Sequence, residues 1–155
     1  MGSGKSVVGA VVAALAGSPF HDLDLMVEDE AGMEIPDIFK TRGEAAFRTL
    51  EKSMLPRALE PGAVVALGGG AVMDDTSWSL VAERAIPVYL EVPFPTLWER
   101  IRAEQSRPLI SGRSESEVEA LFEARRRRYE MAPLRVKGDR AIREVAEEVL
   151  RLWSG

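Results

Sequence analysis

The sequence contains no cysteine and only one histidine, His21, among its 155 residues. Without cysteine the chain forms no disulfide, no thiolate metal site and no cysteine nucleophile. A single histidine also argues against a histidine-based metal site or catalytic triad. No run of about 18 apolar residues free of charge occurs, so we expect no membrane-spanning helix and no membrane partner. We therefore expect a cytoplasmic protein.

The charge balance is acidic, with 25 acidic against 20 basic side chains and a net charge of −5. That balance argues against nucleic acid as the main partner. Hydrophobic residues make up 46% and charged residues 29%, which is typical of a globular protein. The length fits one domain spanning residues 1–155. Because no long apolar heptad repeat is present, we expect a monomer.

Short apolar runs alternate with segments of helical periodicity along the chain. The runs at 63–67 and 86–92 indicate buried strands, and a weaker strand is expected at 134–137. Helices are expected after residue 6 and at 26–31, 43–60, 95–104, 117–131 and 140–153, with Pro56 kinking the third of these. This alternation predicts an α/β fold, a parallel sheet with helices on both faces. Ligands of such sheets bind beyond the carboxyl ends of the strands.

The N-terminal segment Gly2-Ser3-Gly4-Lys5-Ser6 matches the end of the phosphate-binding loop G-x-x-x-x-G-K-[ST]. In such a loop, backbone N–H groups and a helix N-terminus enclose a polyphosphate, lysine adds a positive charge, and the serine hydroxyl reaches a magnesium ion. A flexible leader is the alternative interpretation. The valine-rich helix predicted directly after Ser6 favours the phosphate loop.

Further candidate residues lie near the predicted strand ends, and each has a purely structural alternative. Asp22 and Asp24 share one face if their segment is extended, or they cap the next helix. Gly68-Gly69-Gly70 permits close approach of a ligand, or forms a plain turn. Arg48 binds substrate, or forms an exposed ion pair with Glu51. Of residues 125–128, all arginine, at most one or two can face one site.

A polar segment at 106–117 interrupts the helical pattern and contains Pro108 and Gly112. Proline and glycine in a polar stretch are typical of a loop. We interpret this segment as a mobile loop that Arg107 opens, and Arg107 as a candidate site residue. An ordinary surface arginine is the alternative.

Taken together, these segments resemble the shikimate kinase family. The segments that carry the resemblance are GSGKS, DLD at 22–24, GEAAFRTLE at 43–51, LGGGAV at 67–72, RPLI at 107–110, and an arginine four residues before Tyr129. They follow the family's order and spacing along essentially the whole chain. The resemblance implies a phosphate-loop kinase that transfers the γ-phosphate of ATP to the 3-hydroxyl of shikimate, in chorismate and aromatic amino acid biosynthesis.

The resemblance also implies a role for each matching residue. Lys5, Asp24 and Arg107 would be catalytic, with Arg107 on a lid, the loop at about 106–117, that would close over the phosphates. Asp24 would also bind shikimate, as would Arg48, Gly69, Gly70 and Arg125. ATP would contact Gly2, Ser3, Gly4, Lys5, Ser6, Arg100 and Arg107, with Arg100 packed on the adenine. Ser6 and Asp22 would hold Mg²⁺, the implied cofactor.

One departure from the family pattern lies ahead of Met1. Family members carry a strand and the first loop glycine there, so we expect a native protein longer by about ten residues, with that strand in the centre of the sheet. Two other functions stay open on the sequence alone. One is another small-metabolite kinase, such as a gluconate kinase, and the other is a non-catalytic nucleotide-binding remnant.

Overall fold

A computed structural model describes residues 2–102 and 112–153 of the chain. The first half of the chain contains, in order, α1 (Lys5–Ala16), β1 (Phe20–Asp22), α2 (Leu23–Ala31), α3 (Ile35–Ala58) and β2 (Val64–Ala66). After the short 3₁₀ helix η1 (Ala71–Met73) come α4 (Asp75–Arg84), β3 (Val88–Glu91), α5 (Phe94–Arg102), α6 (Glu115–Tyr129), β4 (Leu134–Lys137) and α7 (Ile142–Trp153). The strands alternate with helices, as the sequence predicts.

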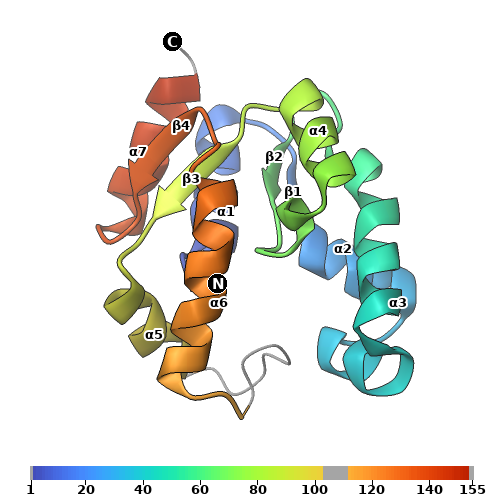
Figure 1. Ribbon diagram of the computed structural model, residues 1–155. Coiled ribbons are helices and arrows are strands. Elements are labelled where there is room, and N and C mark those ends of the chain that lie inside the picture. Colours follow the sequence, from blue (N-terminus) through green and yellow to red (C-terminus); the bar gives the residue numbers. More distant parts are fainter. Residues whose placement is uncertain (1, 103–111, 154–155) are drawn as a thin grey trace.

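The strands pair as two parallel ribbons rather than as one continuous sheet. β1 pairs with β2, with Phe20 opposite Val64, and β3 pairs with β4, with Val88 opposite Leu134. Figure 1 shows β3 and β4 beside α7, and β1 and β2 on the side of α2, α3 and α4. The parallel α/β architecture predicted from the sequence is therefore confirmed.

A cavity of about 600 Å³ separates the two ribbons. Its walls include residues of β2 and β3 and the apolar side chains Val8, Val12, Val81 and Val149. Within residues 2–102 and 112–153, no strand pairs with the edges that β2 and β3 turn to this cavity.

Apolar side chains bury the helices against the ribbons in three clusters. One lies between α2, α3 and α4 and includes Leu23, Ile38 and Leu55. A second joins α5 to α6, and a third joins α1 and α7 through residues such as Val12 and Val145. Packing on both sides of the ribbons holds the carboxyl ends of the strands at one rim.

The long helix α3 is interrupted at Gly43 rather than at Pro56. Gly43 has φ 82° and ψ 168°, whereas Pro56 lies within the last helical turns without a break. The expected kink at Pro56 is therefore wrong. A backbone with those angles is accessible to glycine and strained for residues with a Cβ. Glycine at this position lets the chain change direction before the segment that carries Arg48.

Replacing Gly43 by alanine should therefore destabilise the protein. A strained backbone of this kind costs about 1–3 kcal/mol, and the free energy of unfolding should fall by that amount. Denaturant titration of the variant and the parent measures the change. Ser53→Ala, an exposed change on the same helix, serves as the control and should stay within about 0.5 kcal/mol. Equal stability of Gly43→Ala and parent would show that this backbone relaxes without cost.

Candidate active site

The N-terminus of α1 lies at one end of the candidate site. Gly4 caps this helix in the left-handed conformation, with φ 82°, and Gly2 also has a positive φ of 61°. The first N–H groups of a helix lack intrahelical partners and carry a partial positive charge. The loop and helix predicted from the sequence thus form together, and their free donors suit an anion.

Arg100, on α5, reaches this loop from the β3 side. Its Nη1 donates a hydrogen bond to the Gly2 carbonyl oxygen at 3.1 Å. A Cβ on Gly2 would lie 2.9 Å from Ile101 Cγ1, so the loop passes close to α5. Ser3 lines the cavity between the ribbons. The structure therefore brings Gly2, Ser3 and Arg100 to one end of the molecule.

Asp22 and Asp24 come from different elements, and the structure selects the helix cap from the two interpretations considered. Asp22 ends β1 and caps α2 by accepting a hydrogen bond from the Asp24 backbone N–H at 3.0 Å, so Asp24 lies in the first helical turn. The two residues do not form one extended segment, because the aspartate cap starts the helix immediately. The two carboxylates nevertheless reach the same loop. Asp22 accepts a hydrogen bond from the Ser6 hydroxyl, and Lys5 Nζ lies 3.5 Å from Asp24 Oδ2.

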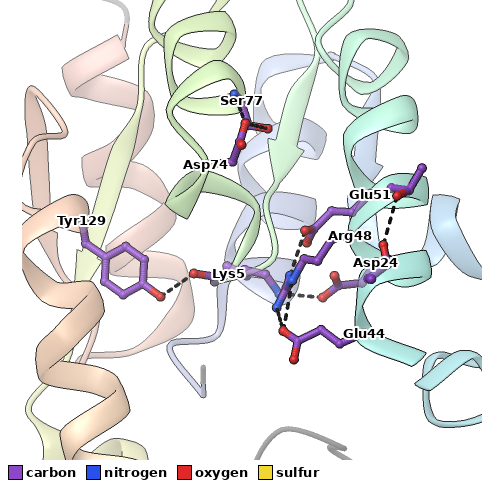
Figure 2. A network of polar contacts seen from close by, with 11 residues as sticks. Lys5, Asp24, Glu44, Arg48, Glu51, Asp74, Ser77 and Tyr129 are labelled. Carbon is purple, nitrogen blue, oxygen red and sulfur yellow. Dashed lines mark hydrogen bonds and ion pairs between the residues drawn. The ribbon is translucent and has the colours of Figure 1, made fainter. Parts of the chain in front are cut away.

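Arg48 projects from α3 toward this group (Figure 2). Its Nη1 donates to Glu51 Oε2 at 2.8 Å, and its Nη2 lies 3.2 Å from Glu44 Oε1. Burial lowers the pKa of Arg48, but the two carboxylates outweigh it and the net shift is upward. The i,i+3 pair considered from the sequence exists, but Glu51 is 4% exposed and the pair is not a solvated one.

Glu51 is a site residue that the sequence analysis treated only as the partner of Arg48. Burial raises its pKa, opposed by the hydrogen bond and charge of Arg48 and assisted by the charge of Asp24. Its second oxygen, Oε1, is buried and has no hydrogen-bond partner in the described part of the chain. The FRTLE segment was the available signal, since it places Glu51 one turn after Arg48.

The glycine turn that follows β2 allows these side chains to converge. A Cβ on Gly68 would lie 2.8 Å from Asp24 Oδ1 and 2.9 Å from Glu51 Oε1. A Cβ on Gly70 would overlap the Arg48 guanidinium. Side chains larger than hydrogen would therefore displace the carboxylates or the arginine, so the turn is more than a loose connection.

Arg125 alone among the four consecutive arginines is buried, at 7% exposure. It lies on α6, and its charge acts on Glu51 and on the Tyr129 hydroxyl. Arg126 and Arg127 are exposed, in agreement with the prediction that at most one or two of these arginines share a site. Tyr129 is a second residue whose role the sequence analysis missed, because it served there only to mark the position of Arg125.

The site thus gathers a phosphate-binding loop, two aspartates, a glycine turn and two arginines at the strand ends. Arg107, and with it residues 106–111 of the expected lid at 106–117, lies outside the described residues; the last three residues of that range belong to helix α6, which begins at Glu115. Among the described residues, no group of three or more His, Cys, Asp or Glu side chains could hold a metal ion. The Ser6 hydroxyl and an Asp22 carboxylate oxygen are in contact, and both are oxygen atoms of the kind that bind Mg²⁺.

Three comparisons with known proteins relate this site to others. The family model for shikimate kinase matches residues 1–153. A shikimate kinase from Salinibacter ruber is 38% identical over 163 residues, covering 98% of this chain and 80% of that protein. The structure of a shikimate kinase from Acinetobacter baumannii in complex with shikimate superposes with a TM-score of 0.94 at 32% identity, covering 99% of this chain and 88% of that one.

A gluconokinase from Sinorhizobium meliloti superposes less well, with a TM-score of 0.55 at 19% identity over 97% of this chain and 85% of that one. Similarity at that level shows a shared fold alone. The family match and the relatives above one third identity agree with the motifs quoted from the sequence, and they single out one kinase family. This chain belongs to the shikimate kinase family.

Proposed function

We propose that this protein transfers the γ-phosphate of ATP to the 3-hydroxyl of shikimate, giving ADP and shikimate 3-phosphate for chorismate and aromatic amino acid biosynthesis. The observation that carries the proposal is the 3.5 Å separation of Lys5 Nζ and Asp24 Oδ2. It places the cation of the phosphate loop beside the carboxylate that faces the glycine turn. A hydroxyl bound by Asp24 is then next to a phosphate bound by Lys5.

ATP binds along the loop and the start of α1. The backbone N–H groups of Gly2, Ser3, Gly4, Lys5 and Ser6 contact the phosphates, which explains why glycines with positive φ begin the helix. Arg100 lies at the Gly2 carbonyl, where its guanidinium can pack on the adenine. Arg107, which lies outside the described residues, is the further cation that we propose for the phosphates.

Ser6 and Asp22 are the residues that would hold Mg²⁺. Their oxygens are in direct hydrogen-bond contact, and Mg²⁺ prefers one or two protein oxygens together with phosphate oxygens and water. When bound, the ion neutralises charge on the β- and γ-phosphates. The donor set present in the chain therefore fits this ion.

Shikimate is an anionic polyol, and the site offers groups of both charges for it. Arg48 and Arg125 bind its carboxylate, because planar guanidinium groups pair with both oxygens of a carboxylate. Asp24 accepts hydrogen bonds from its hydroxyls, and the backbone of Gly69 and Gly70 supplies further contacts. Glu51 holds Arg48 through the 2.8 Å bond to Nη1 and keeps its guanidinium at the turn.

Phosphoryl transfer requires little covalent help from a protein, so this site acts by positioning and by neutralising charge. Asp24 accepts the proton of the attacking shikimate hydroxyl. The hydroxyl oxygen forms a bond to the γ-phosphorus, and the bond between the γ-phosphorus and the leaving oxygen of ADP breaks. Lys5 stabilises the charge on the transferring phosphoryl group. A closed lid excludes water and limits hydrolysis of ATP.

Arg48→Ala tests the substrate assignment directly. The variant should bind shikimate more weakly by about 2–5 kcal/mol, because a charge-assisted contact is lost, and should bind ATP almost as the parent does. Arg48→Lys should also bind shikimate more weakly than the parent, since lysine cannot form the bidentate pair with a carboxylate. Titration calorimetry with each ligand measures both effects.

Arg57→Ala is a matched control for this experiment. Arg57 lies on the same helix and pairs with Glu30 at 3.5 Å, but it is far more exposed than Arg48. Its loss should leave both affinities unchanged. Shikimate affinity equal in Arg48→Ala and parent would exclude the proposed carboxylate contact.

We further propose a monomer in the cytoplasm that acts on small molecules alone, without nucleic acid or membrane partners. In the described part of the chain, no helix is long and apolar enough to cross a membrane. A gluconate kinase is the less favoured alternative, because the family match and the LGGGAV and FRTLE segments favour shikimate. A non-catalytic remnant would bind ATP and shikimate without turnover, and a coupled ADP-release assay with shikimate distinguishes it.

A further inference from the structure

A hydrogen bond joins the last residue of α6 to the glycine turn. The Tyr129 hydroxyl donates to the Gly69 carbonyl oxygen at 2.7 Å. Arg125 lies four residues earlier on the same helix, so the two side chains lie on one helix face. The bond therefore links the turn to the helix that carries Arg125. None of the catalytic steps derived above uses it.

The Tyr129 hydroxyl lies within the electrostatic influence of Arg125 and Arg48, the two arginines assigned to the shikimate carboxylate. Burial raises the pKa of Tyr129, while a hydrogen bond and charge from Arg125 and the charge of Arg48 act in the opposite direction. Arginine offers donors and no acceptor. The Tyr129 O–H therefore donates to the Gly69 carbonyl oxygen and not to Arg125, whose positive charge acts on the same hydroxyl.

The opposite side of the same turn is set by Arg48. A Cβ on Gly70 would overlap its guanidinium, so backbone and side chain are in close contact there. Arg48 comes from α3 and Arg125 from α6, and both helices pack against η1, which starts at the end of the turn. The turn is therefore the structural element that the two arginines share.

We propose that Tyr129 is a positioning residue of the substrate site. By bonding to Gly69 it fixes the glycine turn against α6, and this sets the distance between Arg48 and Arg125 to the width of one carboxylate. The inference rests on the proposed function, which assigns both arginines to the shikimate carboxylate. Figure 2 shows Tyr129 and Arg48 on opposite sides of the turn.

Tyr129→Phe removes the hydroxyl and keeps the ring. We expect KM for shikimate to rise about 3- to 10-fold, because one neutral hydrogen bond is lost. The kcat should stay within about twofold of the parent value, and KM for ATP should be unchanged. A residue that only stabilises the fold would not shift one KM selectively. Melting temperatures of parent and variant should be similar.

Tyr89→Phe is the matched control. The Tyr89 ring contacts the Tyr129 ring with centroids 5.7 Å apart, but its hydroxyl makes no hydrogen bond within the described residues. Its kinetic constants should equal those of the parent. An unchanged KM for shikimate in Tyr129→Phe, or an equal rise in both variants, would overturn the proposal.

Amide hydrogen exchange gives a readout that does not depend on activity. The Ala71 N–H donates to the Gly68 carbonyl at 3.0 Å and the Met73 N–H to Gly70 at 3.1 Å, so both amides report on the turn. They should exchange faster in Tyr129→Phe than in Tyr89→Phe, with or without shikimate. If the parent fails to phosphorylate shikimate, the proposed function fails, and unchanged exchange would separately refute the link between Tyr129 and the turn.

Discussion

Replacing Asp24 by asparagine should lower kcat for shikimate phosphorylation by about 10²- to 10⁴-fold, the usual contribution of a general acid–base group. Asparagine keeps the size of the side chain but cannot take a proton from the attacking hydroxyl. It also ends the ion pair with Lys5, which the structure places 3.5 Å away. Steady-state kinetics at saturating ATP and shikimate measure the loss.

Two further aspartates test whether this effect is specific. Asp75 is exposed on α4, with a side chain 88% accessible, so Asp75→Asn should leave kcat unchanged. Asp22→Asn should instead raise the magnesium concentration needed for half-maximal rate, because Asp22 is paired with Ser6 rather than with Lys5. The same magnesium dependence in the Asp22 and Asp24 variants would contradict our division of labour between them.

Replacing Lys5 by methionine should lower kcat by about 10²- to 10³-fold, the cost of removing one group that stabilises transition-state charge. Methionine preserves an unbranched apolar chain, so the helix start at Gly4 should persist. Because the lysine charge acts mainly on the phosphoryl group in transit, KM for shikimate should change far less than kcat. Single-turnover measurements of phosphoryl transfer report the chemical step directly.

Lys52→Met controls for the loss of a lysine charge near an aspartate. Lys52 pairs with Asp74 at 2.9 Å on an exposed surface, and exposed pairs contribute little. This variant should keep the parent's kcat. A Lys5→Met enzyme with unchanged kcat would mean that the backbone donors at the start of α1 carry the phosphate without help from the lysine.

The sequence by itself predicted the elements whose signals are local. The strands β2 and β3 follow from short apolar runs bounded by turn residues, and α1 follows from valines at helical spacing after the loop. β4 was expected as a weaker strand. The capping of a helix by Asp22 was one of two interpretations considered, and the structure selects it. In these segments, neighbouring residues along the chain determine the conformation.

The break in α3 shows where local rules were insufficient. Proline at position 56 predicted a kink, yet the helix ends only two residues later, while Gly43 carries the actual break. A proline near a helix end costs less than one in the interior, and a glycine permits angles that no pattern of hydrophobic residues reveals.

The tertiary structure alone decided which charged residues meet. Arg125 is buried whereas Arg126 and Arg127 are exposed, although the sequence around them is uniform. Glu51 and Tyr129 acquire roles only because the glycine turn brings α3 and α6 together across a long stretch of chain. The residue types and their order determined the family and its chemistry, while the distances between side chains required the fold, because contacts between remote segments leave no periodic signal in a single sequence.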